Sequence, residues 1–81
     1  MSLDDIIDRV KWEILRAQAL YPRFQSYHQA YAVILEELDE LWQEIKQKDK
    51  NDVHIVTEAI HVAAMAIRFL YDLEEGSVRF E

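Results

Sequence analysis

The near absence of glycine and proline is the feature that most constrains this chain. One residue of each type occurs among its 81 residues, so few positions favour a sharp turn. Apolar residues recur at intervals of three and four along most of the sequence and do not alternate with polar ones. That spacing is typical of amphipathic helices and not of strands. The sequence therefore predicts an all-α fold.

Three helices are predicted, over residues of about 3–20, 26–48 and 52–75. Side chains that can cap a helix N-terminus precede them: Ser2, with Asp5 completing a capping box, Ser26, and Asn51 or Asp52. Pro22 ends the first helix, and Gly76 is the predicted stop of the third. The chain is expected to be a single all-α domain over residues 1–81.

The third predicted helix is apolar on almost every side, from Val53 to Tyr71. Two further helices of the same chain cannot easily surround it. If two chains paired their second and third helices, a four-helix-bundle core would bury it. Small residues at Ala63, Ala64 and Ala66 would permit close approach of helices. We therefore expect a homodimer or a dimer of dimers.

Charge and cysteine content exclude several classes of function. Nine Lys and Arg residues against sixteen Asp and Glu residues give a net charge of −7, which repels phosphate backbones and anionic lipids. No nucleic-acid or membrane partner is expected. There is no cysteine, so disulfides and thiolate zinc sites are excluded. The start of the chain lacks the pattern of a signal peptide, and a cytoplasmic location is expected.

The second predicted helix places several carboxylates on one side. At about 100° per residue, Glu37, Glu40 and Glu44 share a face on which Val33 lies one turn earlier and Ala30 two turns earlier. If that face is partly covered, the carboxylates repel one another and need protons or a cation. The alternative is an ordinary solvated face of charged residues.

Between His54 and Asp72, the third predicted helix carries its charged residues and histidines in a single row. Its members are spaced by 4, 3, 4, 3 and 4: His54, Glu58, His61, Met65, Arg68 and Asp72. Either this row is the part of the helix that faces solvent, or it faces the second helix. In the second case Glu58 and His61 meet the carboxylates of the second helix. Glu-x-x-His is also the spacing used in dimetal sites of helical bundles.

A family resemblance rests on these residues. The pattern Glu36-Glu37-x-x-Glu40, followed on the next helix by Glu58, resembles the EExxE and ExxD motifs of the MazG-like all-alpha nucleoside triphosphate pyrophosphohydrolases. The stretches HQAYAVILEELDELWQEIKQK and AIHVAAMAIRFLYDL are similar to a small single-domain branch of that family, over about residues 24–75.

The resemblance implies a metal-dependent hydrolase. The substrate would be a nucleoside or deoxynucleoside triphosphate, cleaved by water to the monophosphate and pyrophosphate in a house-cleaning role. Magnesium, or manganese, would be held by Glu36, Glu37, Glu40 and Glu58. Glu37 or Glu40 would act as the base towards water. Arg68 and Lys48 are the cations best able to reach the triphosphate.

His61 departs from the family pattern, because it stands where the motif has aspartate. Imidazole is a poor ligand for Mg²⁺ and a good one for Mn²⁺, Fe²⁺, Zn²⁺ or Ni²⁺. Three alternatives follow. His61 is a ligand and the metal preference differs from that of the family, or Mg²⁺ is bound with fewer protein ligands, or catalysis has been lost. Two other functions are therefore retained: a non-catalytic dimeric interaction or nucleotide-sensing module, and a redox dimetal protein.

Overall fold

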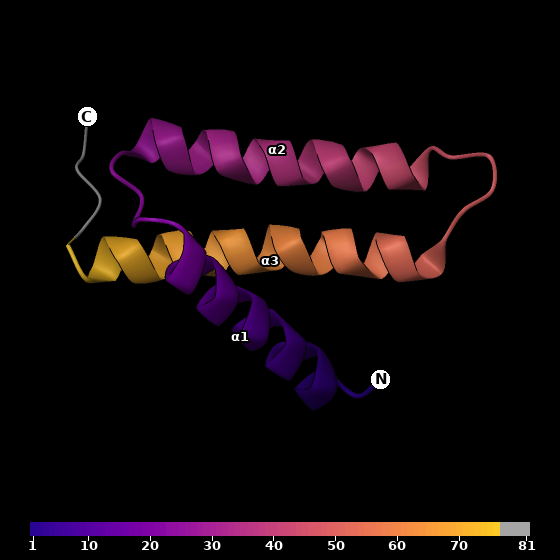
Figure 1. Cartoon of the computed structure of the whole chain (residues 1–81), viewed down its shortest axis with the longest axis horizontal. Coiled ribbons are helices and arrows are strands. Elements are labelled where there is room, and N and C mark those ends of the chain that lie inside the picture. Colours follow the sequence, from indigo (N-terminus) through magenta and orange to yellow (C-terminus); the bar gives the residue numbers. More distant parts are fainter. Residues whose placement is uncertain (77–81) are drawn as a thin grey trace.

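The structure is a computed structural model that describes residues 1–76. Within them it contains three α-helices and no strand: α1 (Leu3–Leu20), α2 (Tyr27–Ile45) and α3 (Asp52–Glu74) (Figure 1). The predicted all-α fold class is confirmed. The predicted domain reaches Glu81, and its last five residues lie outside the described part of the chain.

The helix N-termini are capped as the sequence predicts. A side-chain oxygen accepts a hydrogen bond from the backbone N–H three residues further on at Ser2, Ser26 and Asn51. Asp5 completes the capping box by accepting from the backbone N–H of Ser2. Gly76, with a φ of 71°, follows the end of α3, in a left-handed conformation that costs glycine little.

The second helix ends earlier than predicted, at Ile45 instead of Lys48. Residues 46–51 are all polar, so no apolar side chain there can pack against α3 and extend the helix. The backbone N–H of Gln47 instead donates to the carbonyl of Glu44 in a tight last turn. Tertiary packing, more than helix propensity, sets this boundary.

The central element is α3. Figure 1 shows α2 antiparallel beside it and α1 crossing it obliquely. Both α1 and α2 pack on α3, and their backbones do not closely approach each other. The buried apolar core is drawn from all three helices and the link after α1: Val10, Ala17, Phe24, Ala30, Ile60, Ala64 and Met65. The space between α1 and α2 is therefore closed on one side by α3.

The row of α3 that runs from His54 to Asp72, the polar row, faces inward. Of the two alternatives, exposure to solvent or contact with the rest of the chain, the structure therefore shows the second. Met65, Arg68 and Asp72 are buried, and Glu58 and His61 are partly buried. Only His54, at the start of the row, is exposed. The apolar residues on the opposite side, such as Ile67 and Leu70, face outward.

Two buried ionisable residues of α3 anchor the link between α1 and α2. The carboxylate of Asp72 accepts the backbone N–H of Phe24 at 3.0 Å. The guanidinium of Arg68 lies 4.4 Å from the centroid of the Phe24 ring and donates to the carbonyl of Pro22. These contacts fix where the chain leaves α1, and thus where α1 lies on α3.

The third helix also has the length and composition of a membrane span. An 18-residue window has a mean hydropathy of 1.5, and 22% of that window is buried inside the chain. This is weak evidence, because core helices of soluble proteins pass the same test. It does show how much apolar surface of α3 this chain leaves uncovered.

Replacing Asp72 tests the anchor. Asp72→Ala leaves the buried N–H of Phe24 without this acceptor, which should lower the free energy of unfolding by about 1 to 3 kcal/mol. Asp39→Ala removes an exposed carboxylate and should change it by less than about 0.5 kcal/mol. Urea unfolding followed by circular dichroism, at one fixed protein concentration, measures both. Equal stabilities would contradict the anchoring role.

Candidate metal centre

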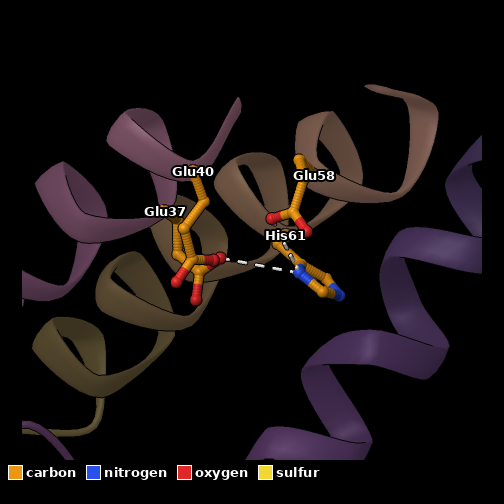
Figure 2. A group of neighbouring side chains, drawn as sticks. All are labelled: Glu37, Glu40, Glu58 and His61. Carbon is orange, nitrogen blue, oxygen red and sulfur yellow. Dashed lines mark ion pairs between the residues drawn. The ribbon is translucent and has the colours of Figure 1, made fainter. Parts of the chain in front are cut away.

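Four side chains from two helices converge beside the core. Glu37 and Glu40 come from α2, and Glu58 and His61 come from α3 (Figure 2). One ligand atom from each lies within 4.8 Å of the other three. Three carboxylates and one imidazole thus surround one small volume.

Local sequence explains why these side chains meet. On α2, Ala30 is fully buried and Val33 packs against the core, on the side that also carries Glu37. These residues bring that side of α2 against α3. Glu37 and Glu40 are three residues apart, as are Glu58 and His61, so each pair projects from one face of its helix.

Two carboxylate oxygens in the cluster are buried without a hydrogen-bond partner. They are Oε2 of Glu37 and Oε2 of Glu58. Each lies 3.5 Å from Nδ1 of His61, which is close enough for attraction but too long for a good hydrogen bond. A buried polar atom without a partner costs free energy. A group that binds the two carboxylate oxygens and Nδ1 of His61 together would remove this unfavourable free energy.

Burial and neighbouring carboxylates change the protonation of Glu37. Its pKa is raised from 4.5 to about 7, chiefly by burial and further by the charges of Glu40 and Glu58, while the imidazole of His61 opposes the shift. Glu37 therefore binds a proton at a pH where most carboxyl groups are ionised. A cation in the cluster would compete with that proton.

The spacing of the cluster suits a divalent cation. Neighbouring oxygen ligands of one Mg²⁺ or Mn²⁺ ion lie about 3 Å apart, because each metal–oxygen distance is about 2.1 Å. Contraction of the 3.5 Å separations would require only small side-chain movements. The donor set of three carboxylates and one imidazole also suits Mn²⁺, Fe²⁺ or Zn²⁺.

The remaining predicted site residues lie around this cluster at different depths. Glu36 is exposed and lines a cleft of about 420 Å³ beside the cluster, but it is not one of the four converging groups. Arg68 lines the same cleft from its buried position in the anchor. Lys48 is exposed in the connection after α2 and does not line the cleft. Substrate contacts of Arg68 and Lys48 stay predictions.

Sequence reasoning missed two residues of α1 that reach the site. The carboxylate of Glu13 lies 3.6 Å from Nε2 of His61, and Arg16 binds that carboxylate through Nε at 3.0 and 3.2 Å. Both residues line the cleft. A signal was present, because Glu13 lies between Val10 and Ala17 on the buried face of α1. An acid on that face indicates a buried partner.

Arg16 also changes the acidity of Glu13. The pKa of Glu13 is lowered below 4.5, first by the hydrogen bond from Arg16 and also by the charges of His61 and Arg16, against the effect of burial. Glu13 is therefore ionised under ordinary conditions. It differs in this respect from Glu37, on the other side of the imidazole.

Known proteins give no further information on the cluster. No family model, no curated protein and no solved structure matches this chain. The function is therefore inferred from the three carboxylates, the imidazole and the adjoining cleft.

Glu37→Gln should remove a pH-dependent contribution to stability. A carboxyl group with a raised pKa in the folded state stabilises the fold below pH 4.5, and this contribution is lost as the pH rises towards 7. At pH 8 without metal, Glu37→Gln should therefore be more stable than wild type by about 1 to 2 kcal/mol, after allowance for solvent screening.

Urea unfolding at pH 5 and pH 8 measures this difference. Glu36→Gln, which alters the exposed neighbour on the same helix, serves as the control and should keep the pH dependence of wild type. A Glu37→Gln variant with the pH profile of wild type would show that Glu37 ionises normally.

Proposed function

We propose that the chain is a metal-dependent nucleoside triphosphate pyrophosphohydrolase. The observation that carries the proposal is the convergence of Glu37, Glu40, Glu58 and His61, with two buried carboxylate oxygens left without partners. The resemblance of Glu36-Glu37-x-x-Glu40 and Glu58 to the MazG-like motifs supplies the reaction class. Nucleoside triphosphate and water would give the monophosphate and pyrophosphate.

The donors present fit a divalent cation, Mg²⁺ or Mn²⁺. Glu37, Glu40, Glu58 and His61 would hold it, and Glu36 lies at the exposed edge of the same cleft. When bound, the cation would offset the charge of the triphosphate oxygens. Because the chain carries a net charge of −7, a triphosphate would meet repulsion here without such a cation.

The chain's own residues divide the remaining tasks. Glu40 is the exposed carboxylate of the four, so it is better placed than Glu37 to orient the attacking water. Arg16 of α1, paired with Glu13, and Arg68 of α3 both line the cleft, and Arg68 would provide positive charge to the triphosphate. Because Arg68 is also buried in the anchor, it would present a fixed charge at little cost in side-chain entropy.

His61 is expected to set the metal preference. Its Nδ1 points at the orphaned oxygens of Glu37 and Glu58, so we propose that it is a ligand in place of the family aspartate. Mn²⁺ accepts imidazole more readily than Mg²⁺ does. The wild-type enzyme should therefore be more active with Mn²⁺.

Pyrophosphate release from a panel of nucleoside triphosphates, with Mg²⁺ and Mn²⁺ in parallel, tests the function. Wild type should favour Mn²⁺, and His61→Asp should shift the preference towards Mg²⁺ because it adds an oxygen ligand and a negative charge. Glu58→Gln should lower turnover by about 100-fold or more. Glu44→Gln, one turn beyond Glu40 and outside the cluster, is the matched control.

The outcomes separate the competing functions. Nucleotide binding without pyrophosphate release would favour a non-catalytic nucleotide-sensing module. Identical metal profiles of wild type and His61→Asp would eliminate the ligand role of His61. Iron bound in purified, coloured protein would favour the redox dimetal function.

We also propose that two chains pair through the outer faces of α2 and α3. On α2, Leu38 and Trp42 are 48% and 55% exposed, and on α3, Ile67 and Leu70 are 46% and 57% exposed. Helical periodicity places these residues on the sides of their helices turned away from Glu37 and Glu58. A second copy laid on this surface would complete a four-helix core and leave the cluster accessible.

Charged substitutions on that surface should separate the chains. Leu38→Lys and Leu70→Lys should each convert a dimer, or a dimer of dimers, into smaller species that keep their helical content. Leu20→Lys, at an equally exposed leucine on α1, is the control. Sedimentation velocity at micromolar concentration measures the change. A wild-type monomer at that concentration would contradict the pairing.

The expected role of Ala64 in pairing is modified by the structure. Ala64 is fully buried within its own chain, so its small size serves the contact of α3 with its neighbours. A bulky residue there would disrupt the chain's own core and would give no information on assembly. Leu38 and Leu70 are therefore the better probes.

A further inference from the structure

The imidazole of His61 lies between carboxylates on both of its nitrogen atoms. Nε2 lies 3.6 Å from Oε1 of Glu13 on α1. Nδ1 lies 3.5 Å from Oε2 of Glu37 on α2 and 3.5 Å from Oε2 of Glu58 on α3. In Figure 2 one edge of the ring faces the labelled carboxylates and the other points towards α1.

A neutral imidazole has a single proton for its two nitrogen atoms. The protonated nitrogen donates a hydrogen bond, and only the other has a lone pair for a metal ion. At His61 the position of the proton decides whether the cluster contains four possible ligands or three. The groups around the ring determine that position.

Glu13 is the carboxylate that faces Nε2, at a distance of 3.6 Å that a small side-chain movement would shorten to a hydrogen bond. Its side chain is only 14% exposed, and Arg16 donates to its carboxylate from two nitrogen atoms, with Nε shared between Oε1 and Oε2 and Nη2 bound to Oε1. The backbone beneath it is fixed because Val10 and Ala17, on the same face of α1, are buried against the core. Glu13 therefore presents a fixed, charged acceptor to Nε2.

We propose that Glu13 is a positioning residue that keeps the proton of His61 on Nε2 and thereby directs the lone pair of Nδ1 at Glu37 and Glu58. The inference rests on the proposed function in taking the cluster to be a cation site. Metal-binding histidines commonly donate their other N–H to a carboxylate, which fixes the ring and increases its basicity.

Loss of Glu13 should move the proton to the other nitrogen. The two orphaned oxygens that face Nδ1 would then be the carboxylate acceptors left near the ring. A proton drawn to Nδ1 would block the lone pair on the side of the cluster. Through Glu13, α1 would control a site whose ligands all come from α2 and α3.

Nitrogen-15 NMR of the imidazoles in metal-free protein tests the positioning directly. At a pH that leaves one proton on each ring, His61 should be protonated on Nε2 in wild type and in Glu13→Gln, whose amide oxygen still accepts. Glu13→Ala should move its proton towards Nδ1. His28 and His54 serve as internal references.

Calorimetric titration with Co²⁺ alone gives the second readout. Glu13→Ala should bind Co²⁺ about 10- to 100-fold more weakly than wild type, and Glu13→Gln should recover most of that loss. Glu44→Ala is the matched control, because it also removes one carboxylate beside a histidine, His54, at 3.3 Å. It should leave the His61 proton in place.

The position of the His61 proton and the affinity for Co²⁺ test the positioning role and the cation site separately. A His61 proton on Nδ1 in wild type, or an unchanged proton in folded Glu13→Ala, would overturn the positioning role whatever the Co²⁺ affinity. The wild-type measurement applies even if Glu13→Ala does not fold. If Glu13→Ala moves the proton but wild type binds no Co²⁺, the positioning role stands and the cation site of the proposed function fails.

Discussion

The burial of the polar row of α3 is the constraint on which the rest of the structure depends. Ionisable groups removed from water need partners, and the two ends of the row obtain them differently. Around Arg68 and Asp72 the link after α1 supplies a carbonyl, a backbone N–H and an aromatic ring. Around Glu58 and His61 a carboxylate oxygen from each of α2 and α3 is left without a hydrogen bond. The polar groups at one end of the row are thus paired within the chain, and those at the other end form a group of donors that could hold a cation.

The same rotation of α3 accounts for the apolar surface. A helix that turns its polar row inward turns its apolar residues outward, and Ile67 and Leu70 are about half exposed as a result. On α2, Leu38 and Trp42 are similarly uncovered. Isolated apolar residues on a surface need no explanation, but several large ones left exposed on each of two helices do. The buried polar cluster and the exposed apolar residues of α3 therefore both follow from the rotation of this helix. A second copy of the chain would cover the apolar residues without disturbing the cluster.

Local patterns predicted the parts of this arrangement that local interactions determine. Ser2, Ser26 and Asn51 cap the helices as expected, because a cap depends on neighbours three residues away. The spacings within α2 and α3 also picked out the four residues of the cluster, together with Glu36 and Glu44, which lie outside it. Two features could not be obtained in that way. Periodicity describes a row but not the direction in which the helix is rotated, so the inward orientation of Glu58 was left open. The crossing of α1 over α3 depends on the buried link at Phe24, so the approach of Glu13 to His61 was not foreseen.

The charge of the cluster gives a physical reason for histidine where the resemblance implies aspartate. Burial, together with the charges of Glu40 and Glu58, already raises the pKa of Glu37 to about 7. A fourth carboxylate in this partly buried position would increase the repulsion and favour the uptake of further protons before a cation binds. An imidazole supplies a donor atom without adding negative charge, provided that its lone pair faces the cluster. A further carboxylate, Glu13, lies on the other side of the ring, where Arg16 neutralises it and where it would act on the ring and not on a cation. On this argument His61 and Glu13 together would take the place of the aspartate in the motif that the chain resembles, so a change at either one should alter cation binding more than a change at the exposed Glu36.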